Sequence, residues 1–308
     1  GGNAHAGQGD LFLAESCEYR RHFLNYSPEH LIITNMELDH PDYFKDLSDV
    51  LAAFSELASK LPEQGNLVIW HEDPNRTLIK TKAVITTYGL SADADVKAEN
   101  IVYNDKGTSF DVNVQGQNIG RLQLAVSGNH NILDALAAIA LTSKLGVPSN
   151  RILQALKGFN GTKRRFERLG TRRGAVIVDD YAHHPTEIQT TLDGARRSYP
   201  GRRIRAVFQP HTFSRTEKLF YEFSQAFQEA DEVVLADIFS SAREKKAGIN
   251  STSSSELAEL IQERGITTRY FPTLEEISSY LEQTLNENDL VITLGAGDVY
   301  KVGQILVS

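Results

Sequence analysis

The feature that most constrains the fold is a regular alternation of short apolar runs with longer segments of helical periodicity in the second half of the chain. Several of these runs are apolar on successive residues, which is typical of strands buried on both faces of a sheet. The runs that predict strands are Ala175–Val178, Ile204–Phe208, Val233–Ala236 and Leu290–Thr293. The segments that predict helices between them are Thr186–Ser198, Ser214–Ala230, Ser253–Arg264 and Leu274–Leu285. Strand–helix alternation with connections of this length predicts a parallel sheet with right-handed crossovers.

The first half begins with the same alternation and then changes pattern. Apolar runs predict strands at Leu11–Ala14, Leu31–Thr34, Leu67–Trp70 and Ala83–Tyr88, and helical periodicity predicts helices at Asp46–Leu61, Ile132–Leu145 and Ser149–Lys157. Between Val96 and Ser127 apolar and polar residues alternate with period two, which predicts an antiparallel hairpin with one exposed face. We therefore expect an α/β protein with a mixed-sheet first domain, residues 1–167, and a compact α/β second domain, residues 168–308.

Composition excludes several functional classes. The 308 residues carry a formal charge of −8, which argues against a general nucleic-acid binder because phosphate contacts need clustered Lys and Arg. Cys17 is the single cysteine, so the chain can form no internal disulfide or cysteine-rich metal site, as expected in the cytoplasm. No apolar stretch reaches the roughly 18 residues of a membrane span, and the first residues do not resemble a signal peptide. Because the chain opens in a loop directly before an expected strand, we expect part of the fold to precede it.

Polar residues follow the first two expected strands. Glu15 and Glu18 come after the first, and His40 follows the second. Ligands gather at the carboxyl ends of strands in parallel sheets, so these side chains are candidates to hold Mg²⁺ beside nucleotide phosphates. The alternative is that they cap helices. Further along, His130, Asn131 and Asp134 lie at the start of an Ala-rich helix, where they either cap the helix or meet a purine edge.

The remaining candidates lie near and within the second domain. Lys163-Arg164-Arg165 is the strongest basic cluster; it suits phosphate oxygens, although solvent exposure also explains such runs. Asp180, His183 and His184 follow the strand Ala175–Val178, and His211 and Arg215 follow the next. Three roles stay open for His183 and His184: acid–base groups, positioning groups, or polar residues at a helix start. Arg215 is suited to a carboxylate. Gly295–Asp298, after the last strand, permits a close backbone approach or a tight turn.

Taken in order, these segments resemble the Mur ligase family, and within it the branch that adds L-alanine. The resemblance rests on Ala14–Phe23, Thr34–His40, Gly128–Ala138, Arg164–Glu167, Asp179–Glu187, Phe208–Thr216 and Gly295–Asp298. It implies a central ATP-binding domain followed by a Rossmann-like domain that binds the amino acid. It also implies an ADP-forming ligase of peptidoglycan synthesis that joins L-alanine to UDP-N-acetylmuramate through an acyl phosphate, with ATP and Mg²⁺.

The resemblance assigns a role to each candidate. Glu15 and His40 are expected to be the metal ligands and, with Arg165 and His184, the catalytic set. His130, Asn131, Asp134, Arg165 and Asp180 are expected to bind ATP, with Asn131 and Asp134 at adenine, Arg165 at the phosphates and Asp180 at the ribose. Glu18, His183, His211 and Arg215 are expected to bind the acceptor substrate, with Arg215 on the carboxylate of alanine.

The sequence departs from the family in two ways. Asp134 stands where the family often has Asn. The glycine-rich phosphate-binding loop and the leading domain that holds the UDP group are absent, so we expect the chain alone to bind ATP weakly and to be inactive. Two alternatives stay open at this point: a relative that attaches a tripeptide to the same nucleotide sugar, and a non-catalytic binding module.

Overall fold

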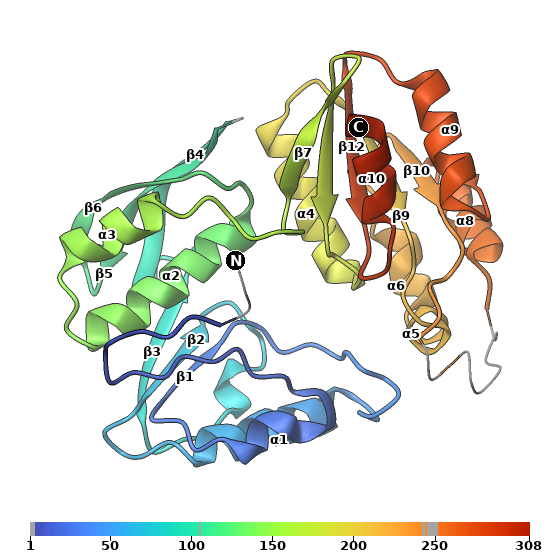
Figure 1. The fold of residues 1–308 in the computed structure, drawn as a ribbon. Helices are drawn as coiled ribbons and strands as arrows, with labels where there is room; N and C mark the ends of the chain where they lie inside the picture. Colours follow the sequence, from blue (N-terminus) through green and yellow to red (C-terminus); the bar gives the residue numbers. More distant parts are fainter. Residues whose placement is uncertain (1–3, 105, 242–243, 245–251) are drawn as a thin grey trace.

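The computed structural model describes residues 4–104, 106–241, 244 and 252–308. Two α/β domains, each built on a six-stranded sheet, lie side by side (Figure 1). The helices of the first sheet's domain end at Lys157, and the second sheet begins at Glu167. The change of sheet therefore falls between Lys157 and Glu167, next to the predicted boundary at residues 167 and 168, which stays a prediction.

The first sheet combines a parallel and an antiparallel part, in the spatial order β1-β2-β3-β4-β5-β6. Its strands are β1 His30–Ile33, β2 Asn66–Trp70, β3 Val84–Gly89, β4 Val96–Asn104, β5 Gly107–Val114 and β6 Gln117–Leu124. The pairs from β1 to β4 are parallel, and the β4–β5 and β5–β6 pairs are antiparallel. The expected period-two hairpin is thus the β5–β6 pair, extended by β4.

Helices cover both faces of the first sheet. They are η1 Tyr19–Asn25, α1 Leu47–Ser59, η2 Arg76–Leu78, α2 Asn129–Lys144 and α3 Ser149–Lys157, where η denotes a 3-10 helix. Helix α2 buries residues 132, 135, 136, 139 and 140, the spacing of one helical face, together with Ala137, and the helix packs on β2, β3 and β4. Leu67 and Ile69 of β2 point to the opposite face, where they pack with Ala58 of α1.

The second sheet is parallel except at one edge and has the order β11-β10-β9-β12-β8-β7. Its strands are β7 Glu167–Arg172, β8 Ala175–Asp180, β9 Arg203–Phe208, β10 Glu232–Leu235, β11 Thr267–Tyr270 and β12 Asp289–Leu294. Only β7 is antiparallel to its neighbour, β8. The four central strands are those that the apolar runs predict, whereas β7 and β11, at the two edges, are not predicted.

Alternate residues of the buried strands build two separate cores. In β8, Val176 and Val178 face a core with α4, whereas Ala175 and Ile177 face a core with α9 and α10. The helices of this domain are α4 Pro185–Ser198, α5 Phe213–Lys218, α6 Phe220–Gln225, α8 Ser254–Glu263, α9 Leu274–Thr284 and α10 Tyr300–Val307. The domain is therefore a three-layer sandwich, and successive apolar positions are needed because both faces of the sheet are covered.

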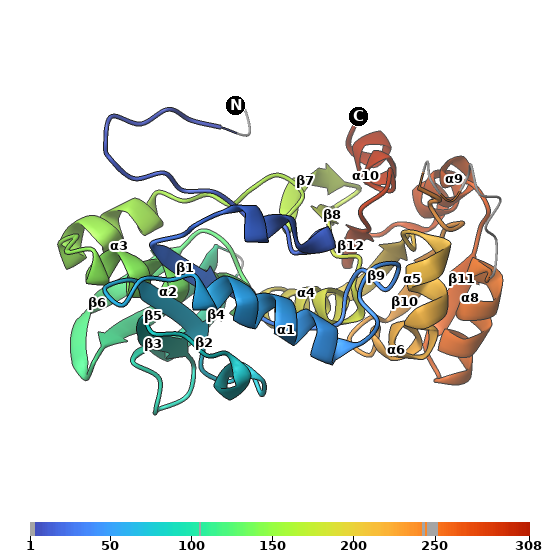
Figure 2. The same ribbon diagram turned by 90° about the horizontal axis from the view of Figure 1, so that it is seen from below.

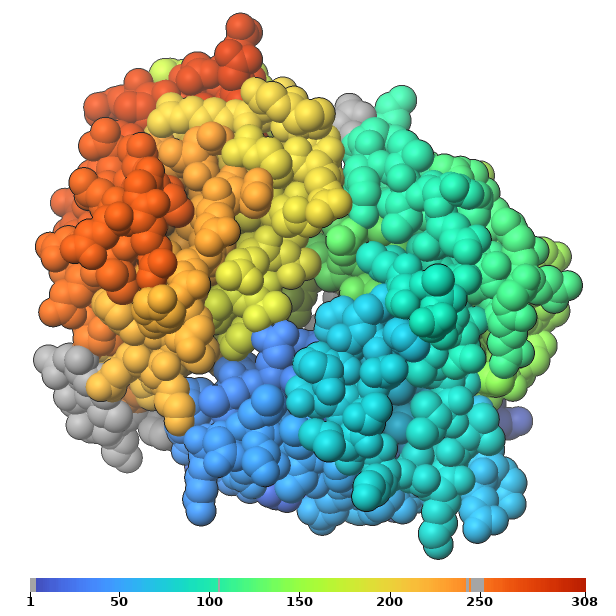
Figure 3. Space-filling view, turned by 180° about the vertical axis from the view of Figure 1, so that it is seen from behind, coloured from blue at the N-terminus to red at the C-terminus, as the bar shows by residue number. Residues whose placement is uncertain are grey.

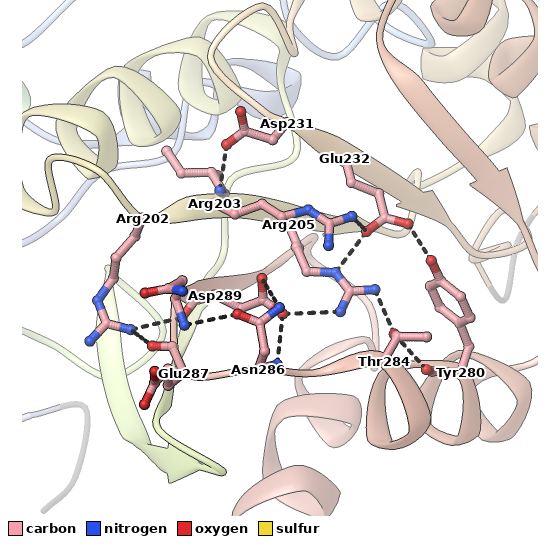
Figure 4. A network of polar contacts seen from close by, with 12 residues as sticks. Arg202, Arg203, Arg205, Asp231, Glu232, Tyr280, Thr284, Asn286, Glu287 and Asp289 are labelled. Carbon is pink, nitrogen blue, oxygen red and sulfur yellow. Dashed lines mark hydrogen bonds and ion pairs between the residues drawn. The ribbon is translucent and has the colours of Figure 1, made fainter.

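A network of charged side chains lies at the amino ends of the second sheet's strands (Figure 4). Arg205 and Glu232 are both fully buried, and Arg205 Nε donates to Glu232 Oε2 at 2.7 Å. Arg205 Nη1 also lies 3.3 Å from Oδ2 of Asp289, the first residue of β12. Arg203 and Arg269 each place a further guanidinium nitrogen within 3.3 Å of Glu232. The sheet thus begins with ion pairs whose partners all lie in one domain.

Two expected elements differ in the structure. Leu11–Ala14 is not a strand; the side chains of Leu11, Phe12 and Leu13 are 70–88% exposed, and this stretch lies outside the two domains (Figure 2). A buried parallel strand needs hydrogen-bonded neighbours and helices over it, and the described residues provide neither here. The expected helix Ser214–Ala230 is interrupted at Leu219, where α5 ends and α6 begins. In the part of the chain that the structure describes, no helix has the length and apolarity needed to cross a membrane.

Candidate functional site

The first part of the candidate site is a cluster of two carboxylates and an imidazole. Asp39 and His40 follow β1, and Glu18 immediately precedes η1. His40 Nε2 lies 3.2 Å from Glu18 Oε1 and 3.7 Å from Asp39 Oδ2, and one ligand atom from each side chain falls within 4.8 Å of the other two. The cluster forms at the carboxyl end of β1, where sequence reasoning places a metal site.

Glu15 is not part of this cluster in the structure. It lies in the exposed stretch before η1, and the group whose ligand atoms meet consists of Glu18, Asp39 and His40. The expected pair of Glu15 with His40 is therefore not brought together here. Sequence reasoning missed Asp39, although the adjacent Asp39-His40 pair at a strand end was a signal that could have identified it.

The donor set of the cluster suits a divalent cation. Carboxylate oxygens outnumber nitrogen donors two to one, in keeping with the preference of Mg²⁺ for oxygen. The hydrogen bond with His40 lowers the pKa of Glu18. Burial alone would raise the pKa of Asp39, but the Arg215 guanidinium and His40 together bring it down to about 2. Both carboxylates are consequently ionised at neutral pH, as cation binding requires.

Arg215 joins this cluster to the second domain. It lies in α5 and is only 6% exposed; its Nε donates to Asp39 Oδ1 at 2.9 Å and its Nη2 to Asp39 Oδ2 at 3.1 Å. Its Nη1 lies 3.4 Å from Nδ1 of His211, whose ring stacks on Phe239. Burial and the Arg215 charge lower the pKa of His211 to about 4, so its imidazole is neutral and accepts from the guanidinium. The structure thus brings the predicted pair, His211 and Arg215, into contact.

The start of α4 supplies the next group. His184 is the N-cap residue, and its Nδ1 accepts from the backbone N–H of Thr186 at 3.4 Å. Glu187 accepts from the backbone N–H groups of both His183 and His184 and so completes a capping box. The Nδ1 of His183 donates to the carbonyl of Tyr181 at 3.0 Å, which makes Nε2 the nitrogen with the lone pair. Burial lowers the pKa of His183, so this ring also favours its neutral form.

Glu37 of the first domain reaches the same helix start. Its Oε2 accepts from Thr186 Oγ1 at 2.6 Å and lies 3.5 Å from His184 Nδ1. Glu37 and Asp39, two residues apart in one loop, therefore contact α4 and α5 respectively. Figure 3 shows the surfaces of the two domains pressed together, with a small opening between them. Sequence reasoning missed Glu37 because its partners are distant in the chain.

Arg164 and Arg165, in the basic segment between the domains, have different surroundings. Arg164 is fixed within the protein: its Nε donates to the buried Asp179 at 3.1 Å, and its guanidinium lies over the rings of Tyr181 and Tyr300. Arg165 is half-exposed, with its Nη1 3.8 Å from Glu187. Arg165 is thus the more exposed of the two arginines, and its expected contact with the phosphates stays a prediction.

Asp180 occupies a different environment from the expected one. It is 3% exposed, and its two oxygens accept from the backbone N–H groups of Phe166 and Ala182 at 2.8 and 2.7 Å. Burial raises its pKa to about 6. In this structure the carboxylate anchors the interdomain segment to β8, and its expected contact with ribose stays a prediction.

The start of α2 faces the second domain. Asn131 Nδ2 donates to the carbonyl of Ser127 at 2.7 Å and lies 2.9 Å from His130 Nε2, so this amide already has partners within the first domain. Burial and the Arg165 charge lower the pKa of His130 to about 4. Asp134 is exposed one turn further along. Gly128, which precedes the helix with φ 104°, lies against Gly194 of α4. The turn Gly295–Asp298, in contrast, packs on Gln209 within the second domain.

Comparison with known protein families identifies the two domains separately. Residues 8–142 match the Mur ligase middle domain, and residues 164–297 match the Mur ligase glutamate ligase domain. Together these two matches cover well over half of the chain. The chain belongs to the Mur ligase family.

Two relatives show where in the Mur ligase family the similarity is high. The UDP-N-acetylmuramate–L-alanine ligase of Desulfitobacterium hafniense is 63% identical over 307 residues, which are 100% of this chain and 68% of that protein. The enzyme of the same name from Caldanaerobacter subterraneus is 42% identical over 99% of this chain and 66% of that protein. The chain thus spans about two thirds of the length of these relatives.

Solved Mur ligase structures share the fold of this chain. The UDP-N-acetylmuramate–alanine ligase of Thermotoga maritima has a TM-score of 0.74 and 27% identity, over 93% of this chain and 60% of that one. A murein peptide ligase from Psychrobacter arcticus has a TM-score of 0.63 at 23% identity, over 93% of this chain and 58% of that one, and shows a common fold only.

Proposed function

We propose that the protein to which this chain belongs is a UDP-N-acetylmuramate–L-alanine ligase, which joins L-alanine to the nucleotide sugar at the expense of ATP. The observation that carries this proposal is 63% identity to a ligase of that name over the whole chain. What supports it in the structure is a site in which the candidate cation cluster of one domain (Glu18, Asp39 and His40) directly contacts the buried arginine of the other. We place the reaction in the cytoplasm, where ATP is available.

The proposed reaction has two steps. A carboxylate oxygen of UDP-N-acetylmuramate attacks the γ-phosphorus of ATP and releases ADP, which leaves an acyl phosphate. The amine of L-alanine then attacks the acyl carbon, and inorganic phosphate leaves as the amide bond forms. This chemistry depends on positioning and on charge neutralisation more than on covalent catalysis. Mg²⁺, held by Glu18 and His40 with Glu15 as the predicted further ligand, would neutralise phosphate charge.

The second domain's residues bind and orient the amino acid in this scheme. Arg215 pairs with the alanine carboxylate, and the neutral His211 beside it keeps the guanidinium in place. His183 has Nδ1 committed as a donor, so in this scheme its Nε2 takes the proton that the amine loses. His184, whose Nδ1 caps α4, acts by fixing the position of that helix.

The first domain and the interdomain segment contact ATP in the same scheme. Arg165 meets the phosphates, since its side chain is half-exposed and, unlike that of Arg164, is not paired with a buried carboxylate. Asn131, His130 and Asp134 present polar groups to the adenine edge from the start of α2. Asp180, the predicted ribose contact, also accepts from the backbone of Phe166 and so holds the segment that carries Arg165.

A substrate panel tests the proposal. The intact protein, including any residues beyond this chain, is incubated with ATP, Mg²⁺, UDP-N-acetylmuramate and one acceptor at a time, and ADP release is followed. We expect release that depends on both the nucleotide sugar and L-alanine. Release with a tripeptide in place of alanine would assign the protein to the tripeptide-adding activity. No release with any acceptor, despite nucleotide-sugar binding, would favour a non-catalytic binding module.

A further inference from the structure

One loop of the first domain, residues 34–40, carries two carboxylates that reach across to the second domain. Glu37 contacts the start of α4 through Thr186, and Asp39 contacts Arg215 in α5. The side chain of Glu37 is about one-third exposed, whereas the pair of Asp39 with Arg215 includes a guanidinium that is almost completely buried. Both contacts bridge the domains, but Glu37 contacts Thr186 whereas Asp39 contacts Arg215.

The geometry of the Asp39–Arg215 contact leaves part of the guanidinium available. Asp39 occupies the side edge of the group, formed by Nε and Nη2, with bonds of 2.9 and 3.1 Å. A guanidinium carries five N–H groups, so the end edge formed by Nη1 and Nη2 retains donors for a second carboxylate. The neutral ring of His211, 3.4 Å from Nη1, restricts rotation about this end. The arginine is thus held by two protein groups without being saturated by them.

Two roles for Asp39 are compatible with such a contact, and they predict opposite effects. Asp39 either competes with the amino-acid carboxylate for Arg215 or orients Arg215 toward it. Competition would require both carboxylates to use the same edge, and the observed contact is confined to the side edge. A buried guanidinium also needs a counter-charge before the amino acid arrives, because an isolated buried charge is strongly destabilising. If Asp39 orients Arg215, the two carboxylates use different edges, and the buried guanidinium has its counter-charge before the amino acid arrives.

On the basis of the function proposed above, we propose that Asp39 is a positioning residue for the amino-acid site. It holds Arg215 by its side edge and presents the end edge to the carboxylate of the incoming amino acid. Because Asp39 lies in the first domain and Arg215 in the second, the amino-acid site is complete only when the domains are together. The loop that carries His40 into the cation-binding cluster therefore also completes the acceptor site.

The kinetic test compares two variants of the intact protein, Asp39→Asn and the matched control Glu37→Gln. Both remove one carboxylate from the same loop and weaken one contact between the domains, but only Asp39→Asn affects Arg215. We expect Asp39→Asn to raise the KM for L-alanine roughly tenfold or more, as for loss of one partner of a buried charge pair, with a much smaller change in the KM for ATP. Glu37→Gln should leave the KM for L-alanine within about threefold.

Three kinetic outcomes would overturn the proposal. A lower KM for L-alanine in Asp39→Asn would show competition instead of orientation. An unchanged KM for L-alanine, with a lower kcat and a greater Mg²⁺ requirement, would make Asp39 only a cation ligand. Equal effects of the two variants would show that the loop acts solely by holding the domains together.

A second measurement does not depend on the ligase activity. Phenylglyoxal modifies accessible, unpaired arginines, and the extent of modification at Arg215 is read by mass spectrometry of its peptide. We expect Arg215 to react several-fold faster in Asp39→Asn than in the wild type or in Glu37→Gln, because its side edge is no longer covered. Equal rates in all three proteins would refute the positioning contact. If the wild type proves inactive with L-alanine but Arg215 is protected by Asp39, the proposed function fails while the contact stands.

Discussion

The two ends of the second sheet both carry buried charges, but they use them differently. At the amino ends of the strands, Arg205, Glu232 and Asp289 pair with one another inside a single domain (Figure 4). At the carboxyl ends, Arg215 pairs with Asp39 of the other domain. The first arrangement is complete when the second domain folds, whereas the second is complete only when the domains meet. Charge removal should therefore affect folding stability at one end and substrate binding at the other.

The largest effect that this comparison predicts is at Glu232. Glu232→Gln leaves the fully buried Arg205 without its nearest anion, and Arg203 and Arg269 lose the same partner. Breaking a buried pair in this way should lower the free energy of unfolding by about 3–5 kcal/mol. Urea denaturation of the intact protein measures the loss. The exposed neighbour pair offers a control, because Glu229→Gln should cost about 1 kcal/mol or less.

The KM for L-alanine of the same variant tests whether the two ends of the second sheet have separate roles. Folded Glu232→Gln protein should retain the KM for L-alanine of the wild type, since no residue of this network lies among those of the candidate site. A raised KM for L-alanine at unchanged stability would show that the amino ends of the strands also influence binding, and the contrast between the two ends would no longer hold.

Asp180 gives a pH-dependent test at the carboxyl end. Its carboxylate is buried and accepts from two backbone N–H groups, with the Arg165 and Glu187 charges making smaller, opposing contributions. Its pKa is raised from 3.8 to about 6, so between these values the folded protein keeps a proton that the unfolded chain has lost. The stability contributed by this group is therefore full below pH 4 and falls as the pH rises to 6, by about 3 kcal/mol for two pKa units.

Asp180→Asn isolates this contribution. Because asparagine does not titrate, the free energy of unfolding of the variant, relative to the wild type, should increase as the pH rises from 4 to 6. Histidines with lowered pKa, such as His130, change stability in the opposite direction in this range, but they do so in both proteins and cancel in the difference. Paired urea titrations at pH 4, 5 and 6 measure this difference in the free energy of unfolding between the variant and the wild type. A difference that does not vary with pH would show that Asp180 is ionised in the folded protein throughout.

Arg215→Lys tests the other half of the comparison. Lysine keeps the charge but cannot make the forked contact that the guanidinium makes with Asp39. We expect a rise in the KM for L-alanine of roughly thirtyfold, about 2 kcal/mol, with a smaller loss of stability than Glu232→Gln shows. Arg121→Lys, at an exposed pair on β6, should change neither quantity and serves as the control. A stability loss equal to that of Glu232→Gln would contradict the comparison.

The same division explains which features could be predicted from the sequence. Strands buried on both faces, such as Ala175–Val178, leave a local pattern of successive apolar residues, and His184-Pro185 marks a helix start. The edge strands β7 and β11 lack that pattern because they are only partly buried. Leu11–Ala14 has it but is exposed, since an apolar run predicts a strand only where neighbouring elements cover it.

The candidate site was predictable as a list of residues but not as a set of contacts. His211 lies two residues before α5 and Arg215 lies in its first turn, so their contact joins residues that are close in the chain. Asp39 and Arg215 are 176 residues apart, and only the packing of two domains brings them together. Asp180 shows the converse: its position at a strand end was predictable, but its burial depends on where the chain crosses between the domains.

The smallest predicted effect tests whether domain contact matters where no charge is involved. Gly194 lies in the middle of α4, where glycine costs about 1 kcal/mol relative to alanine, and an added Cβ would come within 3.2 Å of the Gly128 Cα. Gly128 belongs to the other domain and precedes the α2 residues proposed to meet adenine. We expect Gly194→Ala to stabilise the second domain by up to about 1 kcal/mol while it displaces the Gly128 segment by a few tenths of an ångström. The KM for ATP should rise about threefold, a cost of well under 1 kcal/mol, and the KM for L-alanine should change less.

Gln189→Ala, on the exposed side of the same helix, is the control; it changes helix propensity alone and should leave both KM values unchanged. If Gly194→Ala lowers stability and leaves the KM for ATP unaltered, the close approach of α4 to Gly128 serves packing alone, and coupling between the domains is confined to the charged contacts at the carboxyl ends of the strands.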